Sequence, residues 1–135
     1  MLDFGSGSGI LAIGAARLGA VVDAVEIDAA ASAHGERNAR ANAVADRIRH
    51  ARTLEDTRGS FDFVVANILR SVLLELADAL VARLASRATL VLSGLVSTDV
   101  PEVSVRYSSL LEGRRPEVYQ NGDWRALAWR RCRRE

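Results

Sequence analysis

A run of glycines near the start of the chain constrains the fold more than any other feature. Gly5, Gly7 and Gly9 follow an apolar segment and precede the apolar run 10–16. Glycine reaches backbone angles that are closed to other residues, and its missing side chain lets a ligand lie against bare backbone. The amide groups at the start of the following helix point toward such a ligand. The pattern therefore predicts a strand, a ligand-binding turn and a helix, in that order.

The spacing of these glycines narrows the class of ligand. The dinucleotide pattern G-x-G-x-x-G, counted from Gly5, requires its third glycine at position 10, which is Ile10. A phosphate-binding P-loop requires a lysine after its last glycine, and the chain contains no lysine. The form G-x-G-x-G, preceded by Asp3, resembles motif I of the class I methyltransferases, which bind S-adenosylmethionine. This resemblance implies that the cofactor is contacted by Gly5, Ser6, Gly7 and Gly9.

A second acidic residue stands where a ribose would need it. The apolar segment 21–25 ends at Glu26, about twenty residues after the glycines. A carboxylate there accepts hydrogen bonds from ribose hydroxyls, and such charge-assisted bonds are about twice as strong as neutral ones. We therefore predict that Glu26 binds the ribose and that Ile27 beside it also contacts the cofactor. A solvated charge at a strand end is the alternative, and Asp28 fits the N-cap of the next helix.

Strand-like and helix-like segments alternate along the chain. Hydrophobic periodicity predicts helices over 10–18, 28–43, 71–84 and 99–110, and strands over 1–4, 21–25, 47–52, 61–66, 89–92, 116–120 and 124–129. The turn-forming residues 121–123 favour an antiparallel hairpin between the last two strands. Together with the motif I resemblance, this order predicts an α/β, Rossmann-like class I methyltransferase fold. We expect a mostly parallel seven-stranded sheet with an antiparallel terminal strand.

Asn67 is the third candidate at the end of a predicted strand. Ligands of parallel sheets lie beyond the carboxyl ends of the strands. The glycine run, Glu26 and Asn67 all follow predicted strands, so we expect them at the same edge of the sheet. The alternative role for the Asn67 side chain is to cap the helix that follows it.

Four segments, in the same order along the chain, resemble one family of methyltransferases. They are segment 3–20, Val25-Glu26-Ile27-Asp28, Val65-Ala66-Asn67-Ile68-Leu69 and Leu92-Ser93-Gly94-Leu95. Together they resemble the catalytic domain of the PrmA family, which methylates amino groups of a large-subunit ribosomal protein. The resemblance covers essentially the whole chain and implies S-adenosylmethionine as cofactor. It also implies that Gly5, Glu26 and Asn67 bind this cofactor.

The resemblance further implies that Asn67 is the catalytic residue, because its carboxamide can orient a substrate amine through both donors and an acceptor. The implied reaction is the displacement of a sulfonium-activated methyl group by an uncharged amine. Catalysis then rests on alignment and on removal of the amine proton. The two histidines, His34 and His50, are expected at the surface, so neither is assigned as a general base. No residue is assigned to a metal.

Composition predicts one small domain outside the membrane. The chain has 135 residues, 49% of them hydrophobic, which fits a single core. One cysteine excludes an internal disulfide framework, and without a long apolar run or a signal-like start we expect a cytoplasmic protein that binds no membrane. The net charge of +1 gives no general attraction to nucleic acid. Arginines at 130, 131, 133 and 134 are expected to form a solvated tail rather than an RNA contact.

The start of the chain defines the domain that we expect. Met1 lies inside the first predicted strand, so residues 1–135 are expected to form an N-terminally truncated cofactor-binding domain. The family's N-terminal helix and substrate-recognition domain would then be absent. Ala43 stands where the family has a helix-ending glycine, which is expected to cost local stability.

Three functions remain open at this point. The first is methyl transfer to amino groups of a ribosomal protein, which would be the substrate partner. The second is a catalytically silent domain that acts as a binding or assembly module. The third is a nicotinamide-dependent oxidoreductase. No feature of the sequence indicates the oligomeric state.

Overall fold

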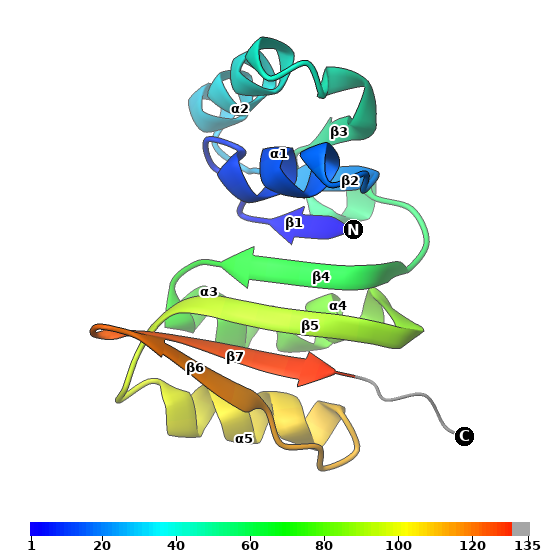
Figure 1. The fold of residues 1–135 in the computed structure, drawn as a ribbon. Helices are drawn as coiled ribbons and strands as arrows, with labels where there is room; N and C mark the ends of the chain where they lie inside the picture. Colours follow the sequence, from blue (N-terminus) through cyan, green and yellow to red (C-terminus); the bar gives the residue numbers. More distant parts are fainter. Residues whose placement is uncertain (131–135) are drawn as a thin grey trace. The chain divides into compact units, whose positions relative to one another are not determined.

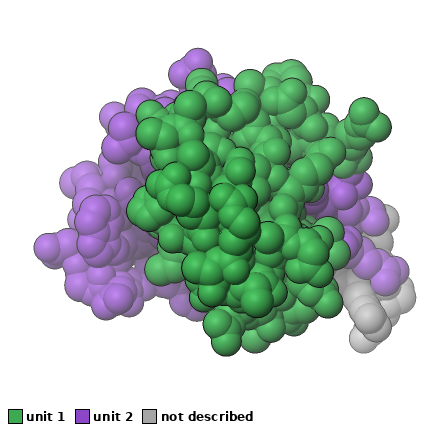
Figure 2. All heavy atoms as spheres, turned by 90° about the horizontal axis from the view of Figure 1, so that it is seen from above, with its two compact units in different colours: residues 1–59 green, residues 60–135 purple. Residues whose placement is uncertain are grey.

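The computed structural model describes residues 1–130, and the chain divides into two compact units. The first unit covers Met1–Gly59 and the second begins at Ser60 (Figure 2, green and purple). Three strands belong to the first unit and four to the second within the described residues. Cys132 and the arginines at 131, 133 and 134 lie outside these residues.

The first unit alternates short parallel strands with helices (Figure 1). Its elements are β1 (Leu2–Phe4), α1 (Ile10–Arg17), β2 (Val22–Val25), α2 (Ala29–Ala41), the 3-10 helix η1 (Ala45–Arg47), β3 (Ile48–Ala51) and the 3-10 helix η2 (Leu54–Asp56). The strand order is β3-β2-β1, and both pairs are parallel. Parallel neighbours need a crossover connection, and α1 and α2 supply these crossovers.

Small and branched side chains form the core of the first unit. α1 buries one stripe of residues at helical spacing, so a single face packs against the strands. The buried residues are Ala12, Ile13, Ala16, Val22, Ala24, Ala39, Val44 and Ile48. Each buried methylene contributes about 0.8 kcal/mol, so this cluster stabilises the packing of α1 and α2 against β2 and β3.

The ends of α2 behave as the sequence predicts. Asp28 is its N-cap, and the carboxylate Oδ1 accepts a hydrogen bond from the Ala31 amide at 2.7 Å. Beyond its other end, Ala43 has a φ of 55°, in the left-handed region that glycine favours. A residue with a side chain costs about 1–2 kcal/mol in this conformation. The positive φ of Ala43 therefore explains the local cost that we expect from the missing glycine.

The second unit combines one parallel and two antiparallel strand pairs (Figure 1). Its elements are β4 (Phe61–Asn67), α3 (Arg70–Glu75), α4 (Ala77–Ala82), β5 (Leu84–Val96), α5 (Val100–Leu110), β6 (Glu117–Asn121) and β7 (Trp124–Arg130). The strand order is β4-β5-β7-β6, so β6 is the edge strand of this unit. The predicted antiparallel hairpin of β6 and β7 is confirmed. All five residues of β6 are exposed.

Two of the predicted element boundaries in the second unit are wrong. The helix expected over 71–84 is two short helices that meet at Leu76, where φ is −95° and ψ is 12°. β5 begins at Leu84 and not at position 89, because Leu84 pairs with Phe61 at the start of β4. A strand pairing between residues distant in sequence thus overrides local helix propensity.

Aromatic side chains join the helices and strands of the second unit. Tyr107 on α5 is fully buried, and its hydroxyl donates to the Leu73 carbonyl at 2.7 Å. Burial raises the pKa of this phenol. The Trp129 ring on β7 lies 5.7 Å from the Tyr107 ring, and its indole N–H donates to the Arg114 carbonyl at 3.1 Å. A buried polar tip with a partner is the usual condition for aromatic residues in a core.

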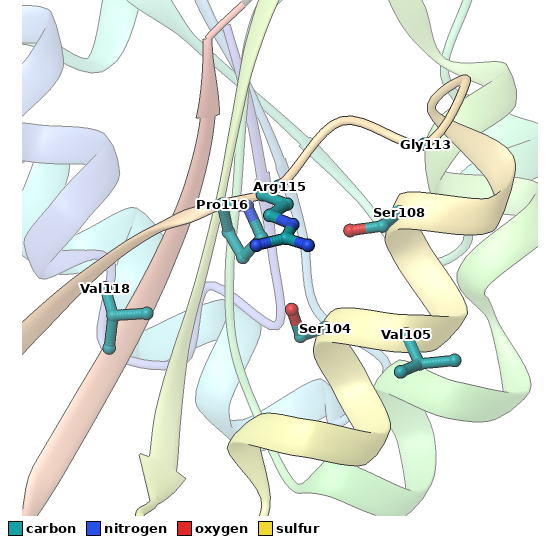
Figure 3. A pocket seen from close by; sticks show the side chains of 7 residues that line it. All are labelled: Ser104, Val105, Ser108, Gly113, Arg115, Pro116 and Val118. Atoms are coloured by element: carbon teal, nitrogen blue, oxygen red, sulfur yellow. The ribbon is translucent and has the colours of Figure 1, made fainter.

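A pocket of about 330 Å³ lies between α5 and the segment that leads into β6 (Figure 3). Figure 3 shows the Ser104 and Ser108 hydroxyls and the Arg115 guanidinium around this space. The Ser108 hydroxyl oxygen also accepts the Trp129 indole N–H at 3.3 Å. The pocket contains none of the residues that the sequence predicts as functional. Within residues 1–130, no helix has the length and apolar character needed to cross a membrane.

Candidate functional site

The glycine loop, residues 5–9, turns sharply between β1 and α1. The amides of Gly5 and Ser6 both donate to the Val25 carbonyl, at 2.8 and 3.0 Å, which fastens the loop to the end of β2. The Gly9 amide donates back to the Ser6 carbonyl at 2.8 Å. Gly5, Gly7 and Gly9 have φ values of 74°, 53° and 84°. All three glycines therefore meet the conformational requirement that the sequence predicts.

Glu26 holds the glycine loop from the end of β2. Its carboxylate Oε2 accepts the Gly7 amide at 2.8 Å, and Oε1 accepts the Asp28 amide at 3.0 Å. Glu26 is half-buried, so its charge is attached to the loop and is still reached by solvent. Each carboxylate oxygen can accept two hydrogen bonds, so lone pairs remain for a ligand.

The surface beside Glu26 suits a nucleoside. A Cβ placed on Gly7 would meet no atom within 4 Å, so the backbone there is open to close approach. Ile27 is 76% exposed and offers an apolar face. Ile10 and Leu11 occupy the first turn of α1, where amides have no acceptor within the helix. These features together suit a sugar diol attached to an aromatic base. The carboxylate can accept from the hydroxyls, the amides can donate to the ligand, and the apolar side chain can cover the base.

Asp3 plays a structural role that its place in the motif does not reveal. It is only 1% exposed, and its Oδ2 accepts the Ala12 amide in the first turn of α1 at 3.0 Å. Burial raises the pKa of this carboxyl, the Ala12 hydrogen bond lowers it and the nearby Glu26 charge raises it, which together bring the pKa to about 6. Asp3 thus links β1 to the helix that follows the loop.

Two residues of α2 also support the glycine loop, and neither is predicted from the sequence. The Asn38 side-chain amide donates to the Ser8 carbonyl at 2.8 Å. Gly35 packs so closely that a Cβ at its position would lie 3.1 Å from the Gly7 carbonyl oxygen. A glycine inside a helix costs about 1 kcal/mol relative to alanine, and this unfavourable choice was the available signal of a packing role.

Asn67 belongs to the second unit, where it is the last residue of β4 and pairs with Ser93 of β5. The N-cap of α3 is Leu69, and no side chain caps that helix, so the capping alternative is ruled out. Asn67 is exposed. Its side chain makes no hydrogen bond to any residue among 1–130. The donors and the acceptor of its carboxamide are therefore free to meet a ligand.

The two histidines differ in exposure. His34 is exposed on α2, as expected, whereas His50, also expected at the surface, is half-buried on β3. In the part of the chain that the structure describes, no three His, Cys, Asp or Glu side chains form a group that could hold a metal ion.

Comparisons with known proteins agree on one family. The family model described as ribosomal protein L11 methyltransferase (PrmA) matches residues 1–132. The ribosomal protein L11 methyltransferase of Trichlorobacter lovleyi is 39% identical over 133 residues, which are 97% of this chain and 43% of that protein. The chain therefore spans less than half the length of this curated relative.

Solved structures give the same fold. The ribosomal protein L11 methylase of Lactobacillus delbrueckii subsp. bulgaricus matches with a TM-score of 0.86 and 34% identity, covering 97% of this chain and 69% of that one. An RNA methyltransferase from Salinibacter ruber, solved in complex with S-adenosyl-L-homocysteine, matches with a TM-score of 0.71 and 22% identity, covering 96% and 78%. The second likeness shows the fold alone. The expected Rossmann-like class of mixed α/β structure is confirmed.

Proposed function

The chain belongs to the ribosomal protein L11 methyltransferase (PrmA) family, and from this premise we propose that it transfers methyl groups from S-adenosylmethionine to amino groups of ribosomal protein L11. The observation that carries the proposal is the Glu26 carboxylate, which holds the Gly7 amide at 2.8 Å beside an open stretch of backbone. This arrangement suits the nucleoside half of the cofactor. Family membership supports the substrate class.

All but one of the residues that would hold the cofactor belong to the first unit. Glu26 would accept the ribose hydroxyls with its remaining lone pairs, and a hydrogen bond to a charged group contributes about 1.5–3 kcal/mol. The glycine loop, including Gly5, Ser6, Gly7 and Gly9, would present backbone to the ligand, and Ile27 would cover the base. When bound, S-adenosylmethionine supplies a methyl group that its sulfonium already activates.

Asn67 would align the acceptor amine and is the proposed catalytic residue. Its exposed carboxamide offers one acceptor and two donors, so it can accept from the amine N–H and direct the nitrogen lone pair. Alignment of reacting groups accounts for a large share of catalysis when the leaving group is already activated. The same amide would also contact the cofactor.

The proposal extends to the setting of the whole protein. Residues 1–135 would form the cofactor-binding domain, and a separate recognition domain of the full-length enzyme would select the ribosomal protein. We expect the protein to act in the cytoplasm, where ribosomal proteins are made, and to bind neither membranes nor nucleic acid directly.

Binding of S-adenosylhomocysteine, measured by isothermal titration calorimetry, tests the cofactor site. Wild type is expected to bind, and Glu26→Ala is expected to lose about 1.5–3 kcal/mol of binding free energy. Glu36→Ala removes a carboxylate that is 46% exposed on α2 and is the matched control, with unchanged affinity. Equal affinity in wild type and Glu26→Ala would remove the basis of the proposal. NAD is titrated in parallel, and binding of NAD alone would favour the oxidoreductase.

Transfer of a radiolabelled methyl group to purified ribosomal protein L11 tests the reaction. Asn67→Ala is expected to slow transfer more than it weakens S-adenosylhomocysteine binding. Equal losses would reduce Asn67 to a cofactor ligand. Cofactor binding without any transfer by wild type would contradict the enzymatic proposal for this chain and favour the silent binding module.

A further inference from the structure

Gly94 lies directly against Asn67, and its lack of a side chain has a geometric consequence. We propose that Gly94 is a positioning residue that lets the Asn67 carboxamide lie across β5 in its working orientation. This inference rests on the proposed function of Asn67. Gly94 itself would touch neither the cofactor nor the acceptor amine.

The first support is an irregularity in β5 beside the end of β4. Leu92 pairs with Leu127 and Leu95 pairs with Arg125, so β5 contains one residue more than β7 over this stretch. Such a bulge bends a strand and changes the direction of nearby side chains, and bulges are common beside active sites. Gly94 lies in the bulge with a φ of 78°, which glycine adopts without strain.

The second support is the distance between the two residues. A Cβ placed on Gly94 would lie 2.6 Å from the Asn67 side-chain oxygen, closer than non-bonded atoms approach. The next nearest atoms belong to the backbone of Ile68, at 3.3 Å for its carbonyl oxygen and 3.5 Å for its nitrogen. The Asn67 side chain is therefore the group that must move most if residue 94 acquires a side chain.

The third support is that Asn67 has no other constraint of comparable strength. Within residues 1–130 its side chain makes no hydrogen bond. Its orientation thus depends on the shape of the surface on which it lies, and Gly94 forms that surface. A methyl group at position 94 would turn the carboxamide away from β5 without removing its chemistry.

The first experiment measures stability and needs no activity. Gly113 is the matched control, because its φ of 76° imposes the same backbone strain and a Cβ there meets no atom within 4 Å. Gly94→Ala is expected to lower the urea midpoint of unfolding more than Gly113→Ala does. The excess is expected to be smaller in an Asn67→Ala background, where the Ile68 carbonyl oxygen, 3.3 Å from the Cβ, still opposes the substitution. An excess of the same size in that background would overturn the inference, because the contact with Asn67 would then be irrelevant.

The second experiment measures methyl transfer by the same variants. Gly94→Ala is expected to lower kcat by about tenfold or more, since misplacement of an aligning group by about 1 Å can cost about a hundredfold in rate. The KM for S-adenosylmethionine is expected to change less than kcat, and Gly113→Ala is expected to retain the wild-type kcat. In the Asn67→Ala background, Gly94→Ala is expected to have no additional effect.

The outcomes separate this inference from the proposed function. If wild type transfers no methyl group, the proposed function fails for this chain, and the stability cycle still decides whether Gly94 sets the position of Asn67. If wild type is active but Gly94→Ala and Gly113→Ala have the same kcat, the proposed function stands and the positioning role is refuted.

Discussion

Replacing Asp3 by asparagine tests the electrostatics under the glycine loop. The Asp3 carboxyl is almost completely buried and accepts the Ala12 amide, and burial raises its pKa from 3.8 to about 6. An asparagine at this position would keep an oxygen for the Ala12 amide while removing the ionisable group. The substitution Asp3→Asn therefore isolates the cost of a buried negative charge.

The size of this cost follows from the pKa. Because the folded protein binds the Asp3 proton more tightly than the unfolded chain does, stability falls as the pH rises from about 4 to about 6. The loss is nearly complete about one pH unit above the folded-state pKa of about 6, and about one unit below 3.8 both states are protonated. One pH unit corresponds to about 1.4 kcal/mol, so a carboxyl with this pKa costs about 3 kcal/mol at neutral pH.

Urea unfolding of wild type and Asp3→Asn over a series of pH values measures this cost. The difference in unfolding free energy, variant minus wild type, is expected to rise by between about 2 and 3 kcal/mol from pH 4 to pH 7. Taking the difference cancels the titration of all other groups to first order. A difference that is flat over this range, or one that falls, would refute the reasoning.

Three further predictions concern the first unit. Gly7→Ala is expected to abolish S-adenosylhomocysteine binding measured by calorimetry. Gly19→Ala is the control, because Gly19 has a φ of 99° and open space around it, and this variant is expected to lose stability but not affinity. Equal affinity of the two variants for the ligand would exclude the open-backbone site. Gly14→Ala is expected to raise the free energy of unfolding by about 1 kcal/mol. Gly35→Ala is expected to raise it less and to weaken ligand binding, because its Cβ would lie 3.1 Å from the Gly7 carbonyl oxygen. The same stability and the same ligand affinity in both variants would disprove support of the loop by α2. Asp28→Ala is expected to cost about 1 kcal/mol in urea unfolding, and no loss would contradict its capping role.

The sequence was sufficient wherever the determining interactions are local. The glycine loop, the N-cap at Asp28 and the hairpin around residues 121–123 depend on neighbouring residues, and all agree with the structure. The start of β5 at Leu84 was missed because it depends on pairing with Phe61. Local periodicity carries no information on such a partner, and the segment therefore looked like the end of a helix.

The same distinction explains what was found of the candidate site. The position of Glu26 beside the glycine loop could be predicted, because its spacing from the loop is a property of the chain itself. The contacts of Asn38 with Ser8 and of Gly94 with Asn67 arise only when separate elements pack together. Single residues on a helix or in a long strand do not indicate which loop they will meet.

The two hydrogen bonds of Glu26 have a consequence for the energetics of recognition. Its oxygens already fix the amides of Gly7 and Asp28, so the glycine loop takes its shape before any ligand binds. A preorganised cradle of this kind loses little conformational entropy on complex formation, and more of the contact energy then remains as affinity. Ligand binding would therefore change the conformation of the glycine loop very little.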